Sequence, residues 1–458
     1  MTTEITHPMT RWLTKRSESL VFIVYATMAA FCTYLCVYGY RKAFAAAIFP
    51  GQVTLPFLPA MDLKVWFVIF QVIGYASSKF IGIKVISELG PQYRSMAIIV
   101  LIGIAELALL LFALTPAPWN AIWLLLNGVP LGMGWGLIFG FLEGRRISEI
   151  LGAGLSASFI VGSGFAKTVG RWFLISGVPE TWMPFVVGLV YLPPLFFFVW
   201  MLDKIPPPSA ADEAARTKRT TMSYADRRRF LILYAPGMLV LTTMYMLLTA
   251  FRDFRDNFAT ELWSALGYGA QPTILTSTET PVAVGVLVVL ASVMVIKSNR
   301  RALFAVHGLM ALGTALMGVS TFLYQQGLLG PISWMVAVGV GLYTAYVPFG
   351  CVLFDRLIAT VGFVGTSGFM IYFADAFGYL GSVLVLLYKN FAQPQLSWIE
   401  FFTIFAYVTS AVCTGSYLIS MFYFDRMAGK IAGAGQIYPR EGGDACPENV
   451  TISATCPT

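Results

Sequence analysis

The chain has 458 residues, hydrophobic residues at 57% of its positions and a mean hydropathy of +0.74. Only 12% of the residues are Asp, Glu, Lys or Arg, which is about half the share in a soluble globular domain. So few charges cannot cover a soluble surface of this size, and so many apolar residues do not stay unfolded in water. The composition excludes a soluble enzyme, a nucleic-acid binder and a disordered chain, and it predicts an all-α, polytopic membrane protein.

Apolar runs of about 17 to 25 residues, the length that crosses a bilayer, recur along the chain. We expect twelve transmembrane helices, at 20–44, 64–84, 95–115, 121–142, 153–175, 182–202, 230–251, 281–296, 302–324, 332–354, 362–388 and 399–424. A polar segment with three consecutive prolines and a basic run separates the first six from the last six. The predicted organisation is a six-helix bundle over 1–202, a cytoplasmic linker over 203–229, a second six-helix bundle over 230–426 and a cytoplasmic tail over 427–458.

The basic residues are distributed unevenly between the two sides of the predicted helices. With a cytoplasmic N-terminus, 21 of the 30 fall in inside segments, and only Lys64 and Lys389 fall in outside loops. The positive-inside rule therefore predicts that both termini are cytoplasmic, in what we take to be a bacterial inner membrane. The other seven lie within or at the ends of the spans, where charge is costly and commonly functional. They are Arg41, Lys42, Lys79, Lys167, Arg171, Arg252 and Arg255.

Three short matches in the same order relate the two halves of the chain. Residues 40–42 match 251–253 at an offset of 211, and 165–170 match 373–378 at an offset of 208. The Phe-Gly pair before Arg146 matches the Phe-Gly pair before Arg356 at an offset of 210. Two parallel six-helix repeats are the architecture of the major facilitator superfamily, in which substrate sits near the midplane between the halves and access alternates.

Arg41 and its repeat mate Arg252 are the leading substrate-binding candidates. Arg41 lies about two-thirds of the way through the apolar run 20–50, so we expect it at membrane depth. Two guanidinium groups facing one cavity would bind a phosphate, sulfonate or carboxylate, since arginine offers forked donors and stays charged when desolvated. The alternative is that both arginines lie at the outer interface or pair with Asp253 and Asp256. Three tyrosines are expected to shape the organic part of the site: Tyr38, Tyr40 and Tyr372.

Further charged residues are candidates for substrate binding, coupling or gating. Lys167 and Arg171 are four residues apart on one helical face, and we expect them to add positive potential to the site. Asp375, the repeat mate of Lys167, is expected to pair with Lys167 when the site is empty. Glu106 is a candidate proton carrier; the alternative is a packing residue that is hydrogen-bonded internally. The remaining gating candidates are Lys79, Glu143, Arg146 and Arg356.

Three stretches of the sequence resemble the organophosphate:phosphate antiporters, the family of bacterial glycerol-3-phosphate and hexose-phosphate transporters. They are the run 40–45 around Arg41, the run 75–81 that contains Lys79, and Arg252. The resemblance implies that Arg41 binds phosphate and that inorganic phosphate is exchanged. Two positions depart from the family: Phe159 replaces its helix 5 histidine, and Ser87-Glu88 replaces its acidic-basic gate pair. The sequence also looks like an uncharacterised bacterial group of transporter-like proteins known only as a domain of unknown function.

The sequence predicts a secondary active transporter of an organic anion, phosphorylated or phosphonate-like, that works by alternating access as a monomer. It shows no phosphate-binding loop, dinucleotide fingerprint or nucleophile elbow, and its six cysteines form no metal-binding pattern, so we expect no enzyme activity, cofactor or metal. One alternative is a proton-coupled symporter or exporter of another acidic solute, in which Glu106 or Asp375 titrates. Another class is a transporter-like membrane receptor. The sequence leaves open the substrate, the direction of transport and the coupling ion.

Overall fold

The computed structural model describes residues 7–16, 19–54, 60–209, 212, 232, 234–361 and 367–433. Each expected span corresponds to one long helix in these ranges. The first six are α2 (Leu20–Lys42), α3 (Leu63–Glu88), α4 (Arg94–Leu114), α5 (Ala121–Phe139), α6 (Ser148–Ile175) and α7 (Met183–Asp203). The second six are α10 (Ala235–Asn257), α13 (Glu279–Met294), α14 (Asn299–Gln325), α15 (Pro331–Tyr346), α18 (Ser367–Leu387) and α19 (Trp398–Gly433).

Within the described residues, ten of these helices are long and apolar enough to cross a membrane. Large apolar side chains remain exposed along their outer faces, for example Leu239 and Leu312, each 70% exposed. In water such surfaces would be costly, but they match the hydrocarbon of a bilayer. The chain is therefore a multi-pass membrane protein.

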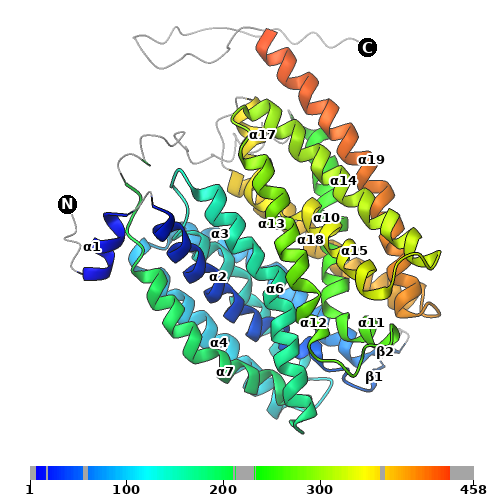
Figure 1. Cartoon of the computed structure of the whole chain (residues 1–458). Helices are drawn as coiled ribbons and strands as arrows, with labels where there is room; N and C mark the ends of the chain where they lie inside the picture. The colour runs from blue at the N-terminus through cyan, green and yellow to red at the C-terminus, as the bar shows by residue number, and fades with distance from the viewer. Residues whose placement is uncertain are drawn as a thin grey trace.

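The helices form two groups that follow the chain order (Figure 1). In the first group α2 packs on α6 and α7, and α5 packs on α3 and α4. In the second group α10 packs on α18 and α19, and α14 packs on α15 and α19. The main contacts between long helices of the two groups are α3 with α18 and α6 with α13. These two contacts define the interface between the halves.

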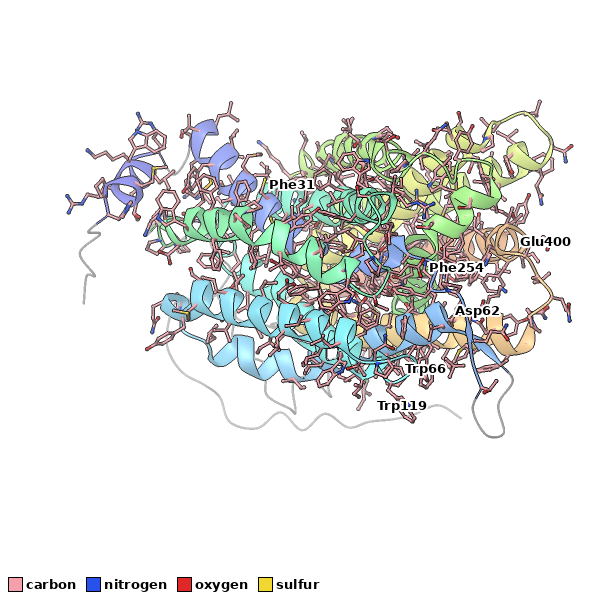
Figure 2. The ribbon with its side chains drawn as sticks, turned by 90° about the horizontal axis from the view of Figure 1, so that it is seen from below. Phe31, Asp62, Trp66, Trp119, Phe254 and Glu400 are labelled. Atoms are coloured by element: carbon pink, nitrogen blue, oxygen red, sulfur yellow. The ribbon has the colours of Figure 1, made fainter. Side chains whose placement is uncertain are left out.

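Short elements join the two groups at one end of the bundle, which we call the junction end. They are η1 (Ala43–Ala46), β1 (Gln52–Val53) paired antiparallel with β2 (Met61–Asp62), α11 (Ala259–Ala265) and α12 (Ile274–Ser277). Figure 1 shows α11, α12 and the two strands together there, and Figure 2 shows Asp62, Phe254 and Glu400 on this side. Both α2 and α10 end at the junction end, and η1 and α11 follow them directly along the chain.

Five further short elements lie elsewhere in the described chain, and the one at Pro348–Cys351 contacts α6 across the interface between the halves. They are α1 (Pro8–Thr14), η2 (Pro91–Tyr93), α16 (Pro348–Cys351), α17 (Leu353–Val361) and the π-helical turn η3 (Tyr388–Ala392). Of the predicted linker and tail, residues 213–231 and 434–458 fall outside the described residues.

Candidate functional site

A cavity of about 60 Å³ lies between the two halves. It is lined by side chains from α2, α3, α5, α6, α10, α15 and α18. Its polar lining is dominated by tyrosines: Tyr34, Tyr38, Tyr75, Tyr245, Tyr346 and Tyr379. Its charged residues are Arg41, Lys79, Arg252 and Asp375. The site is therefore cationic and aromatic, and both halves contribute to it.

Arg41 lies near the end of α2, with 4% of its surface exposed. Its guanidinium carbon lies 3.6 Å from the ring centroid of Tyr75 and 5.8 Å from that of Tyr38. Its Nε has no hydrogen-bond partner, and within the described ranges the side chain forms no ion pair. Arg41 is thus at the cavity, as the sequence predicts, and is a buried cation that packs against aromatic faces.

Arg252 also lines the cavity but carries its own counter-ion. Its Nη2 lies 2.8 Å from Oδ1 of Asp253, and the other oxygen of Asp253 accepts a hydrogen bond of 2.8 Å from Ser382. The pairing that sequence reasoning treated as an alternative is therefore present for Arg252. The two repeat-related arginines share a position but differ in pairing, because within the described ranges Asp253 forms an ion pair with Arg252 and not with Arg41.

A chain of hydrogen bonds connects Arg252 to the opposite half. Nη1 of Arg252 donates to the hydroxyl of Tyr346, which lies 2.9 Å from the hydroxyl of Tyr245. The Tyr245 hydroxyl donates to Oδ1 of Asp375, and Oδ2 of Asp375 lies 3.0 Å from Nζ of Lys79. Asp375 therefore pairs with Lys79 from α3, across the interface between the halves.

The expected pairing of Lys167 with Asp375 is wrong. Nζ of Lys167 instead lies 2.6 Å from Oδ1 of Asp256, whose other oxygen lies 2.7 Å from Nζ of Lys42. Repeat symmetry relates α6 to α18 and α3 to α13, and the contacts across the interface join α6 to α13 and α18 to α3. Residues at equivalent repeat positions thus face different partners and do not face each other.

Lys167 and Arg171 do not line the cavity; both belong to the junction end. Arg171 donates to the carbonyl of Gly269 at 3.2 Å, and one turn earlier on α6 the hydroxyl of Thr168 lies 2.7 Å from that of Thr276. Lys42, Lys167 and Asp256, which we call the junction cluster, join α2, α6 and α10. The cluster holds the two halves together at this end.

Two further candidates lie away from the cavity. Tyr40 is two residues from Tyr38, about 200° around the helix, so it points into the first half, and its buried hydroxyl has no hydrogen-bond partner among the described residues. Glu106 on α4 packs against Gly188 of α7, where a Cβ atom would lie 1.9 Å from its Oε2. Neither oxygen of Glu106 has a hydrogen-bond partner among the described residues, so the expected internal hydrogen bond is absent there. Tyr372 lies on α18, but its side chain is outside the described ones.

The gating candidates at the other end of the bundle contact their own half or the linker. Nη2 of Arg94 lies 4.0 Å from Glu143, and Nη1 of Arg356 donates to Asn299 at 2.8 Å. The backbone N–H of Arg146 donates to Asp212 at 3.1 Å. Burial raises the pKa of the Asp212 carboxyl, but hydrogen bonds, including this one, outweigh burial and lower it overall.

Sequence reasoning missed most of the aromatic lining. Of the three tyrosines expected, Tyr38 lines the cavity, Tyr40 does not, and the side chain of Tyr372 lies outside the described ones. A usable signal exists for Tyr245, which precedes Arg252 by seven residues, or two helical turns, and so shares its face. Tyr75 lies one turn before Lys79 in the same way. Helical spacing from each buried cation would have identified both.

The family described as "Family of unknown function (DUF5690)" matches residues 43–427. The chain belongs to this family. No curated protein matches the sequence. The DUF5690 fold is similar to solved structures of the nucleoside transporter NupG (15% identity, TM-score 0.54) and of a D-xylose–proton symporter (13%, 0.55). It is also similar to a solved structure of a double tryptophan mutant of XylE, at 14% identity and a TM-score of 0.57.

These similarities extend over almost the whole of each chain. They cover 88%, 88% and 90% of this chain and 99%, 96% and 99% of the three solved chains, in the same order. At such low identity the likeness concerns the fold alone. The DUF5690 protein has the major facilitator fold, with two six-helix halves around a central cavity.

Proposed function

We propose that this DUF5690 protein is a secondary transporter that carries a small organic anion across the membrane by alternating access. The observation that carries the proposal is Arg41, which is 4% exposed, lines the cavity between the halves and forms no ion pair in the described part of the chain. A buried cation without a counter-ion is costly. An anion in the cavity would supply the missing charge.

The lining favours an anion with a compact acidic group and a polar organic body. A guanidinium group offers parallel donors that match phosphate, phosphonate or carboxylate oxygens. Tyrosine hydroxyls and ring faces suit a hydroxylated or ring-containing body. The resemblance of the runs around Arg41 and Lys79 to the organophosphate:phosphate antiporters supports a phosphorylated or phosphonate-like substrate.

The proposed mechanism uses residues 1–202 and 230–426 as the two moving halves, with 203–229 as linker and 427–458 as tail. The basic residues favour cytoplasmic termini in a bacterial inner membrane, which puts the junction end outside. The comparison structures are, by their titles, a nucleoside transporter and a D-xylose–proton symporter. Proton coupling therefore stands beside phosphate exchange in this proposal, and we take the unit to be a monomer.

A thermal-shift screen of the purified protein tests the anion site. Phosphate, phosphonates, sugar phosphates and carboxylates are compared, because a ligand that binds the folded state raises the apparent Tm. We expect at least one acidic compound to raise the Tm of the wild type and to have no effect on Arg41→Gln. The matched control is Arg300→Gln, which removes an exposed arginine paired with Asp425. A ligand that stabilises Arg41→Gln as well as wild type would refute the role of Arg41.

Counterflow in liposomes distinguishes a transporter from a receptor that only binds the ligand. A transporter loaded with the screening hit accumulates labelled ligand from outside, whereas a receptor binds it without accumulation. Driving the same liposomes with a pH gradient or with internal phosphate then separates proton coupling from phosphate exchange.

A further inference from the structure

Glu106 differs from the other carboxyl groups that are buried in the described ranges. Its side chain is 8% exposed, and neither of its oxygens has a hydrogen-bond partner there. Three other carboxylates are similarly buried, and each forms an ion pair with an arginine or a lysine: Asp253, Glu279 and Asp375. A buried polar group without a partner is costly, so its place in the fold calls for a physical explanation.

Two tyrosine hydroxyls without partners lie beside Glu106. The hydroxyls of Tyr40 on α2 and Tyr191 on α7 are buried and have no hydrogen-bond partner among the described residues. Tyr40 interacts electrostatically with Glu106, and both tyrosines interact with Cys36. Tyr191 follows Gly188 by three residues, so it shares the face of α7 that contacts Glu106. Three unpartnered polar side chains, from α2, α4 and α7, thus meet inside the first half.

The described helices that pack against α4 bring no cation to this carboxyl. They are α2, α5 and α7. α5 carries no charged residue, and the only one on α7 is its last residue, Asp203. On α4 itself Arg94 is twelve residues from Glu106, about 18 Å along the helix. On α2, Arg41 lines the cavity and Lys42 belongs to the junction cluster. An ionised carboxylate here would be desolvated and unpaired, a cost that the neutral acid avoids.

The carboxyl lies just beneath the lipid-facing surface of α4 and α7. Leu107, the next residue on α4, is exposed, and so is Leu189, which follows the glycine that contacts Glu106. Gly103, one turn before Glu106, is also exposed, and no atom lies within 4 Å of where its Cβ would be. The missing side chain leaves a gap beside Glu106 on the side that faces the bilayer. An apolar molecule dissolved in the lipid can approach the carboxyl through this gap.

We propose that Glu106 is a proton-binding site inside the first half, and that its protonated carboxyl reacts with hydrophobic carbodiimides that enter from the bilayer. The carboxyl proton moves to one carbodiimide nitrogen while a carboxyl oxygen bonds to the central carbon, which gives an O-acylisourea. The acyl group then migrates from that oxygen to the unprotonated nitrogen, and the product is a stable N-acylurea. The reaction needs the proton of the acid and releases no co-product, so the ion-paired carboxylates do not undergo it.

The proton site is separate from the anion cavity. Arg41 lines the cavity, whereas the neighbouring side chain of Tyr40 points away from it toward Glu106. A proton and an anion would therefore bind to the first half at different places, and neither would displace the other. This inference does not depend on the proposed function, because it stands on the burial and the surroundings of Glu106 alone.

Labelling in lipid vesicles tests the reactive site. Protein reconstituted in vesicles at neutral pH is treated with dicyclohexylcarbodiimide, and its peptides are mapped by mass spectrometry. We expect one reagent molecule per chain, attached to Glu106, and no labelling of Glu106→Gln. The matched control is Asp425→Asn, which removes an exposed, ion-paired carboxylate and should be labelled like wild type. A charged, water-soluble carbodiimide should label Glu106 far more slowly.

Infrared spectroscopy gives a second measurement, of protonation itself. A protonated carboxyl has a carbonyl stretching band that a carboxylate lacks, so the wild-type spectrum minus that of Glu106→Gln should show one such band at neutral pH. Absence of the band, or a label on an ion-paired carboxylate such as Asp375 and none on Glu106, overturns the proton site. Equal labelling by the water-soluble reagent overturns entry from the bilayer. If Glu106→Gln folds poorly, peptide mapping of the wild type still locates the label. None of these results depends on whether an anion binds at Arg41.

Discussion

The junction cluster gives the sharpest prediction for alternating access. Asp256 faces Nζ of Lys42 at 2.7 Å and Nζ of Lys167 at 2.6 Å, and both lysines are nearly inaccessible to solvent. Asp256→Asn keeps the shape of the side chain but removes the only charge that compensates them in this cluster. The two buried cations then repel each other across the interface of α2, α6 and α10.

The size of the effect follows from burial. Removing one partner of a buried ion pair costs about 3–5 kcal/mol, because the remaining charge stays desolvated. The cost applies to the conformer that is closed at the junction end, since opening exposes both lysines to water. At about 1.4 kcal/mol per factor of ten, the closed conformer loses roughly a hundred-fold to a few thousand-fold in relative population.

Disulfide cross-linking measures this population directly. Thr168 and Thr276 lie on opposite halves with their hydroxyl oxygens 2.7 Å apart, so a Thr168→Cys/Thr276→Cys pair should cross-link only when the junction end is closed. In a background without the six native cysteines, Asp256→Asn should slow cross-linking strongly. Asp425→Asn, which breaks an exposed ion pair, should leave the cross-linking rate unchanged. Equal cross-linking rates in the Asp256→Asn variant and its parent would refute this reasoning.

Three other substitutions have expected outcomes. Gly164→Leu should slow the same cross-linking, because even a Cβ there would lie 2.1 Å from the carbonyl oxygen of Leu275; a rate equal to the parent's would count against it. Glu106→Gln should leave the Tm within a few degrees of wild type, since a buried carboxyl without a partner is neutral, whereas a large loss would indicate an ionised carboxylate. Asn127→Leu should lower the Tm markedly, because its amide bridges Gln71 and the carbonyls of two helices; an unchanged Tm contradicts this.

The helices and the cavity arginines were accessible from the sequence for simple physical reasons. A span of a bilayer needs a long apolar run, so each helix leaves a signal that no other segment of the chain mimics. Arg41 and Arg252 stand out because charge is rare in such runs. The matched positions of these two residues in the repeat were enough to predict that both line the space between the halves.

The pairing of charges was not accessible in the same way. Repeat symmetry tells which residues are equivalent, whereas ion pairs depend on which helices touch across the interface. Lys167 therefore pairs with Asp256 and Asp375 pairs with Lys79, although the repeat suggested otherwise. Hydrogen bonding through tyrosines such as Tyr346 requires three helices to meet. Residue spacing within one helix does not reveal which helices meet.

One difference between the repeats gives the proposed binding site a polarity. Arg41 is followed by Lys42, which reaches across to the second half, whereas Arg252 is followed by Asp253, which neutralises it. The negative end of a cargo would thus be held mainly by the first half, and its other end would face the second. The proposed substrate would then keep a fixed orientation in the protein. It would move with the first half while the second half rotates around it.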